Sequence, residues 1–311
     1  MKLKNSLKLV VTNFGLFWKL LIYKIVVLLL VFLLLLPIIS KIDVALTQSG
    51  FFDELAKIFN GVALRGVATF VTSTCGIISS FFVACSMLIE MGFVIFLYFV
   101  FIVFIVAPFL LHLSDVPTSE CLYSYMTSLN KFSFIVNFTD KLKMSVGYSI
   151  LKTIIELPFF AILICVSYNI GVLVNINSVL TILAPFLWTI FVVFMLVLKS
   201  ALESGWAQGI VCFNVCAFKG LKRGFKSVSR NYLGVMSSFA VIVVVSLGIT
   251  LIFGAYALVI ILPFITLISC IFGQVLFFES QGMNYYIAPE EIIKPRKLEQ
   301  ADSNRRVKFI I

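Results

Sequence analysis

The sequence predicts an all-α, polytopic membrane protein, a transmembrane helix bundle with about six spans, and three observations support this fold class. Of its 311 residues, 61% are hydrophobic, only 12% are charged, and the mean hydropathy is +1.13. A soluble domain is roughly 45–50% apolar and about 25% charged. A soluble globule of this length has no means of burying so much apolar surface. The composition therefore excludes a soluble enzyme, a disulfide-stapled secreted domain and a disordered regulator.

The apolar residues are concentrated in long runs, and a spanning helix needs roughly 20 of them. Five runs pass this test: Leu20–Ile39, Gly92–Leu111, Ile150–Val174, Val179–Leu198 and Leu233–Phe278. The last run is far too long for one helix, so we expect it to fold back near Phe253–Tyr256. The chain then forms three hairpins, each entering and leaving the membrane on the inner side. A short echo supports this pattern, because the residues around Lys8 resemble those around Lys226.

The segment between Arg65 and Glu90 carries 24 uncharged residues but is rich in Ser, Thr and Gly. On a helix, its small residues form a stripe that is a candidate packing seam: Thr69, Ser73, Gly76 and Ser80. Two alternatives stay open for this segment. It is either an amphipathic helix on the outer surface or a spanning helix packed through its small side chains.

The distribution of Lys and Arg predicts the orientation, since short cytoplasmic loops carry these residues. With six spans and a cytoplasmic N-terminus, 21 of the 24 basic residues lie inside; the exceptions are Lys41, Lys57 and Arg65. Seven spans with an external N-terminus place 19 inside but require a basic N-terminus to be translocated. We therefore expect a multi-pass protein of the bacterial cell membrane with both termini cytoplasmic. Residues 1–279 form the membrane domain, and residues 280–311 form a cytoplasmic tail.

Basic residues beside the apolar runs predict contact with lipids of the anionic inner leaflet. The N-terminal stretch is expected to form an amphipathic helix along that leaflet. Candidate lipid contacts lie before the fifth span: Lys219, Lys222, Arg223, Lys226 and Arg230. Trp206 is expected at the membrane interface. Lys outnumbers Arg three to one, whereas nucleic-acid recognition relies on Arg, so the predicted partners are membrane lipids and other membrane proteins, not nucleic acid.

The basic stretch Lys219–Lys226, followed by Arg230–Tyr232 and a new span, resembles a turn found in a broad group of bacterial membrane proteins. These are the largely uncharacterised six-helix families similar to the membrane domain attached to some glycerophosphodiester phosphodiesterases. The stretch Phe278–Tyr286 is similar to endings in membrane proteins of low-GC Gram-positive bacteria. The resemblance implies a six-helix fold in the cell membrane but no activity. The soluble phosphodiesterase domain is absent from this sequence, so its activity is not carried over.

The candidate functional residues are Lys152 and Glu156 in the third span. An ionisable residue inside the bilayer is costly and is therefore a functional candidate. Lys152 lies one helical turn before Glu156, so the two side chains are expected to pair. Pro158 leaves a backbone carbonyl free at the same depth. The prediction is a polar notch that binds a headgroup or a cation; the alternative is a snorkelling pair near the inner interface.

The motifs of familiar enzymes are missing from the sequence. It contains no nucleophile elbow, no zinc-protease helix motif and no phosphate-cradling glycine loop. Its single histidine, His112, lacks a partner motif, so we expect no catalysis, no cofactor and no metal. The first functional hypothesis is a scaffold or accessory subunit of a membrane or envelope assembly. The alternative is a transporter or lipid-handling protein with a polar notch near Glu156.

Overall fold

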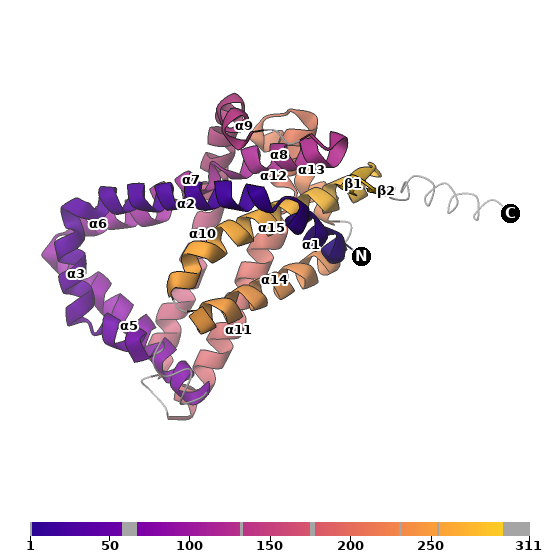
Figure 1. Cartoon of the computed structure of the whole chain (residues 1–311). Helices are drawn as coiled ribbons and strands as arrows, with labels where there is room; N and C mark the ends of the chain where they lie inside the picture. The colour runs from indigo at the N-terminus through magenta and orange to yellow at the C-terminus, as the bar shows by residue number, and fades with distance from the viewer. Residues whose placement is uncertain are drawn as a thin grey trace.

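The computed structural model describes residues 2–57, 67–130, 133–174, 178–229, 232–253 and 255–294. Among these residues, five helices are long and apolar enough to cross a membrane, or six if the bent pair Ala217–Ser229 and Tyr232–Ser246 is counted as one span. The predicted all-α helix bundle is confirmed (Figure 1). The fold-back predicted near Phe253–Tyr256 is also present, because α14 ends at Phe253 and α15 begins at Ala255.

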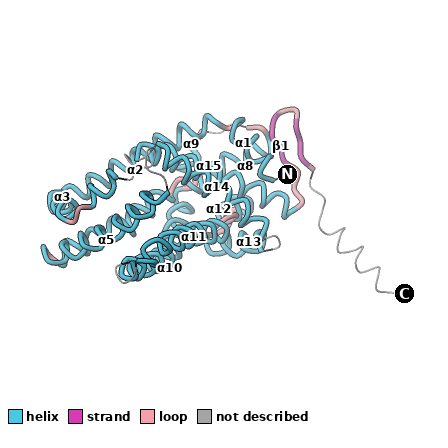
Figure 2. The backbone as a smooth tube through the Cα atoms, turned by 90° about the horizontal axis from the view of Figure 1, so that it is seen from below, coloured by secondary structure: helices cyan, strands magenta, loops and turns pink. Residues whose placement is uncertain are grey.

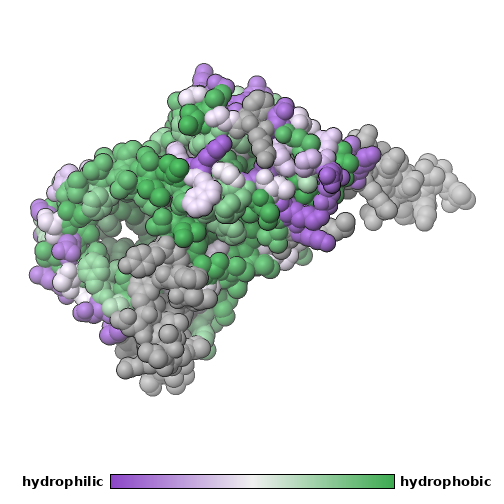
Figure 3. Space-filling view, in the orientation of Figure 1, coloured by the Kyte–Doolittle hydropathy of each residue, from purple (hydrophilic) through white to green (hydrophobic). Residues whose placement is uncertain are grey.

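The spanning helices form three hairpins in chain order. The first contains α2 (Phe14–Leu35), η1 (Leu36–Ile38), α3 (Ile39–Gln48), α6 (Phe93–Phe101), η2 (Ile102–Val106) and α7 (Ala107–His112). The second contains α10 (Leu142–Val174) and α11 (Ser178–Glu203), which lie side by side in Figure 2. The third contains α14 (Tyr232–Phe253) and α15 (Ala255–Gln281). The long helices follow the apolar runs of the sequence, and hydrophobic residues dominate the surface along α2 in Figure 3.

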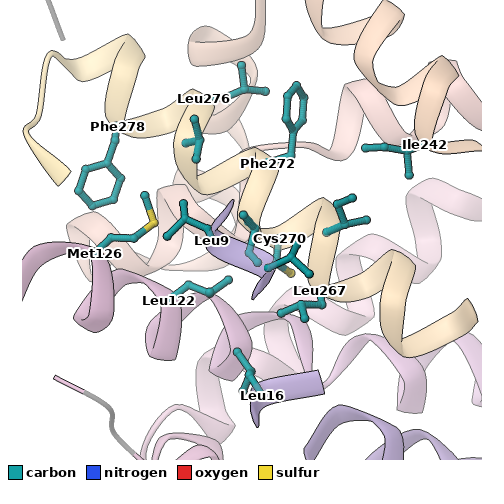
Figure 4. Close-up of a cluster of buried hydrophobic side chains, with 14 of the residues drawn as sticks. Leu9, Leu16, Leu122, Met126, Ile242, Leu267, Cys270, Phe272, Leu276 and Phe278 are labelled. Carbon is teal, nitrogen blue, oxygen red and sulfur yellow. The ribbon is translucent and has the colours of Figure 1, made fainter. Parts of the chain in front are cut away.

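The remaining short elements gather at one end of the bundle, and we call them the cap. They are α1 (Lys2–Thr12), α8 (Asp115–Ser128), α9 (Phe134–Asp140), α12 (Trp206–Phe213), α13 (Ala217–Ser229), β1 (Tyr285–Ala288) and β2 (Glu291–Ile293). Hydrophilic residues concentrate over this end of the molecule (Figure 3). Buried side chains from α1, α8 and α15 meet beneath it: Leu9, Leu122, Met126, Phe272 and Phe278 (Figure 4). The segments predicted to lie on the inner side of the membrane are therefore brought together in one layer.

The first and last described elements of the chain meet in the cap. The Asn5 side-chain amide donates a hydrogen bond to the Tyr285 hydroxyl at 3.1 Å. The Lys8 ammonium lies 2.8 Å from the Glu291 carboxylate. The two ends of the membrane domain thus lie together in the cap. This contact agrees with the predicted six spans, and the number of crossings stays a prediction.

The segment between the first two spans contains α5 (Val67–Met91), a single helix that packs against α3 and α6. Gly76 of the predicted seam does lie at a close contact, because a Cβ atom there would stand 2.5 Å from a carboxylate oxygen of Glu54. Ser80 is partly buried. The side chains of Thr69 and Ser73 lie outside the described residues, so the seam stays a prediction over that half.

The predicted tail begins with structure. β1 and β2 form an antiparallel hairpin in which Tyr285 pairs with Ile293. Tyr285 and Ile287 are buried against the cap, in contact with α1 and α8. Residues 295–311 lie outside the described part. The hairpin also covers one face of α1, whose Leu9 is fully buried, so this amphipathic helix packs on protein as well as facing outward.

Candidate functional site

Seven acidic, basic or histidine side chains line one cavity of about 270 Å³ where the three hairpins meet the cap. We call it the charged cavity. These seven residues come from α2, α7, α8, α10 and α11: Lys24, His112, Asp115, Lys152, Glu156, Lys199 and Glu203. Burying charges is costly unless they are paired, so the first question is how each group finds a partner.

Lys152 and Asp115 form the first buried pair, with the ammonium 2.9 Å from the carboxylate. The Tyr148 hydroxyl donates to the same carboxylate oxygen at 3.2 Å. Asp115 is the first residue of α8, where the positive end of a helix dipole favours a carboxylate. The Glu203 carboxylate lies 3.5 Å from the other side of Lys152. Lys152 therefore stands between two acidic groups contributed by different helices.

Glu156 is the second centre of charge and is only 1% exposed. Its Oε1 atom lies 2.8 Å from the Lys199 ammonium, and its Oε2 atom lies 2.9 Å from Nε2 of His112. The other ring nitrogen of His112, Nδ1, lies 3.4 Å from Asp115. The imidazole therefore bridges the two carboxylates and joins the pairs into one network.

The pairs across the second hairpin follow a simple register. α10 carries Lys152 and Glu156, and α11 carries Lys199 and Glu203, with the same spacing of four residues. Because the helices run antiparallel, each lysine faces the glutamate of the other helix: Lys152 faces Glu203, and Lys199 faces Glu156. This cross-pairing replaces the predicted pair along α10, since no ion pair joins Lys152 directly to Glu156 among the described residues.

Lys24 differs from the other two lysines of the cavity. It is 3% exposed, and its ammonium donates to the backbone carbonyl of Leu111 at 2.5 Å. Within the described part of the chain, no carboxylate oxygen lies within 4.0 Å of this ammonium. An ammonium has three N–H donors, so Lys24 keeps donors for another group. Glu203 keeps acceptor capacity, because its Oε1 atom is buried without a hydrogen-bond donor.

The glycine at the junction of α11 and α12 places Glu203 at the cavity wall. Gly205 has a φ of +84°, a left-handed conformation that glycine adopts without strain. The chain turns there, and α12 begins at Trp206. Trp206 is only 1% exposed, and its indole N–H donates to the Ala217 carbonyl at 2.7 Å. The expectation that Trp206 anchors at the membrane interface is therefore wrong, because the cap buries it.

The predicted basic residues lie on the outward face of α13. Lys219, Lys222, Arg223 and Lys226 are exposed, whereas Gly220 and Gly224 are buried against α12. The Arg223 guanidinium lies 4.0 Å from the centre of the Phe213 ring. Arg230 lies outside the described residues. The geometry is compatible with the predicted lipid contacts, which stay a prediction.

Two of the seven charged residues, Lys152 and Glu156, were singled out from the sequence, and the structure places both in the cavity. The others lie at or near the ends of apolar runs, where a charged residue is expected at the membrane boundary and does not indicate a site. One signal was present: Lys199 and Glu203 repeat the four-residue spacing of Lys152 and Glu156. His112 carried no signal, because its partners are distant in sequence.

No protein-family model, curated protein or solved structure matches this chain. The resemblance to six-helix bacterial membrane proteins stays a prediction. Within the described ranges, no group of His, Cys, Asp and Glu is arranged to hold a metal ion. The function is therefore argued from the charged cavity itself.

Proposed function

We propose that the protein binds a small charged group in the charged cavity, as a transporter or a lipid-handling protein of the membrane. One observation carries this proposal. Seven acidic, basic or histidine side chains from five helices line one cavity inside a protein whose composition is only 12% charged. Ionisable residues in spanning helices are rare, and they mark substrate and ion pathways.

A purely structural role explains this arrangement less well. Apolar side chains of similar volume pack a bundle as stably as a buried ion-pair network does, and often more stably. The network also leaves hydrogen-bonding groups of both charges without a partner. Among the described residues, Lys24 has no carboxylate oxygen within 4.0 Å of its ammonium, and Glu203 has a carboxylate oxygen without a donor. A bound group with an anionic part and a cationic part would pair with both of these side chains.

The chemistry of the cavity favours a zwitterion. The Lys24 ammonium suits a phosphate or a carboxylate, since charge-assisted hydrogen bonds are the stronger ones. The Glu203 carboxylate suits an amine. Three lysines and three carboxylates line the cavity, so its wall offers partners for both an anionic group and an amine. The proposed cargo class is therefore a small molecule or a headgroup that carries an anionic group and an amine.

A thermal-shift assay on the protein in detergent tests this proposal with three probes: inorganic phosphate, ethanolamine and phosphoethanolamine. At about 100 times Kd, a ligand of the folded state adds about 2.7 kcal/mol of stability. We expect phosphoethanolamine to raise the melting temperature more than either single-charge probe. Equal shifts for all three probes, or no shift for any, contradict a zwitterion site.

The accessory-subunit hypothesis stays a prediction. Its own test is co-purification from membranes in mild detergent, and a homogeneous monomer without partners counts against it. The expectation that the protein is not an enzyme likewise stays a prediction.

A further inference from the structure

An apolar groove of about 410 Å³ lies beside the charged cavity, beneath α13. Its size falls in the range of roughly 300–1,000 Å³ that is typical of ligand pockets. Apolar residues from α10, α11, α12 and α13 form the walls: Phe159, Leu202, Trp206, Leu221 and Phe225. Phe225 is 51% exposed, so the groove reaches the outer surface of the bundle.

The position of α13 relates this groove to the membrane surface. α13 makes an angle of 96° with α14, so it runs along the membrane when α14 crosses it. Its exposed face combines Lys219, Lys222 and Lys226 with Phe218 and Phe225. A helix with this pattern lies at the boundary between headgroups and acyl chains. The groove beneath it is therefore open to a lipid chain.

Two charged residues stand in the groove wall, and they have opposite sign. Lys222 belongs to α13 and is exposed on its basic face. Glu203 belongs to α11 and lines both the groove and the charged cavity. An occupant with an apolar chain, a phosphate and an amine matches the apolar walls, Lys222 and Glu203 respectively.

We propose that the groove holds one acyl chain of a phospholipid with a primary-amine headgroup. The phosphate pairs with Lys222, and the amine reaches Glu203 at the wall of the charged cavity. The inference rests on the proposed function, because Glu203 serves both spaces, and it specifies the zwitterion as the headgroup of a membrane lipid. Binding by the chain is distinct from binding by the headgroup, so the two are tested separately.

Trp206 lies in the groove wall and provides the readout. In a background of Trp18→Phe and Trp188→Phe, it is the remaining tryptophan of the sequence. The full chain is placed in phosphatidylcholine vesicles that contain phosphatidylethanolamine with brominated chains, which quench a tryptophan at short range, so a chain in the groove reaches the buried Trp206 through the groove wall. We expect strong quenching of Trp206. We expect brominated phosphatidylglycerol, which lacks the amine, to need about tenfold more lipid for the same effect.

Matched variants assign the quenching to the groove. Leu221→Phe fills the groove and should reduce quenching at least about twofold, whereas Leu233→Phe on the exposed face of α14 should leave it unchanged. Lys222→Gln should weaken quenching, and Lys219→Gln, on the same helix but outside the groove, should not. Glu203→Gln should remove the preference for the amine. Quenching that is insensitive to Leu221→Phe, or equal for both headgroups, overturns the inference.

The soluble probe separates this inference from the proposed function. If phosphoethanolamine binds but brominated lipids do not quench Trp206 selectively, the groove proposal fails and the charged cavity remains a solute site. If neither binds, both proposals fail.

Discussion

At the scale of single residues, the charged cavity is an arrangement of paired groups around one spare lysine. Lys152 and Lys199 face acidic partners across the second hairpin, and His112 connects Glu156 to Asp115. Lys24 alone among the three lysines relies on a backbone carbonyl in the described structure. In the proposed function, the pairing keeps the cavity intact and the spare lysine binds the ligand.

The first prediction concerns Glu156. Glu156→Gln removes the buried carboxylate that faces the partly exposed Lys199, and breaking a buried ion pair costs about 3–5 kcal/mol. We expect a large fall in the free energy of unfolding, measured by chemical denaturation in detergent. Glu291→Gln is the matched control, because its pair with Lys8 has the same 2.8 Å distance but is about 40% exposed. Its expected cost is about 0–1 kcal/mol. Similar losses for both variants contradict the buried network.

The second prediction concerns Tyr285, which lies outside the spanning helices. Burial raises the pKa of its phenol above the ordinary value, and the adjacent Glu279 carboxylate raises it further. The stability that this hydroxyl contributes is present below pH about 10 and is lost as the pH rises above it. In an ultraviolet titration of tyrosinate, the difference between wild type and Tyr285→Phe should appear above pH about 10. A difference that titrates at or below that pH contradicts the buried position of the hairpin.

At the scale of elements, α13 is held in the cap by close backbone contact with α12. A Cβ atom on Gly224 would lie 2.7 Å from the Gly205 carbonyl carbon, and one on Gly209 would lie 2.7 Å from the Gly220 carbonyl oxygen. Such contacts explain why the buried face of α13 consists of small residues while its basic residues face outward. They also fix the groove, since α13 forms one of its walls.

Gly224→Ala should therefore destabilise the cap. Backbone atoms stand in the way of the new methyl group, and overpacking costs about 1–3 kcal/mol. Gly147→Ala on α10 meets nothing within 4 Å, so it should be neutral or stabilising by up to about 1 kcal/mol. Thermal unfolding of the two variants checks the difference. A Gly224→Ala protein as stable as Gly147→Ala rules out the close α12–α13 contact.

At the scale of the whole molecule, three hairpins share one cap, and the predicted topology crosses the membrane six times. The predicted orientation places this cap in the cytoplasm, since most of the basic residues belong to its segments or lie beside them. Cys216 tests this, because it is an exposed cysteine between α12 and α13. With the other six cysteines replaced, a membrane-impermeant thiol reagent should label Cys216 in inside-out vesicles but not in right-side-out vesicles. Labelling of Cys216 only in right-side-out vesicles would show that the orientation is opposite to the predicted one.

The hairpins were predictable because spanning helices depend on local composition. Runs of apolar residues located the five helices that are long enough to span, as well as α14, and the break in the last run lies within a few residues of Phe253. The site was predictable only where its residues are close in sequence, as Lys152 and Glu156 are. Lys24, His112 and Asp115 join them through helix packing, which depends on register and crossing geometry. The composition of a segment does not determine its register or its crossing angle with other helices.

Equilibrium binding of phosphoethanolamine to the charged cavity tests the central claim most directly. Isothermal titration calorimetry compares wild type with Lys24→Met and with Lys19→Met, an exposed lysine of the same helix. The cavity account predicts binding to wild type and to Lys19→Met, and a weakening of about tenfold or more in Lys24→Met. Equal affinity in all three proteins, or no binding to wild type, contradicts it.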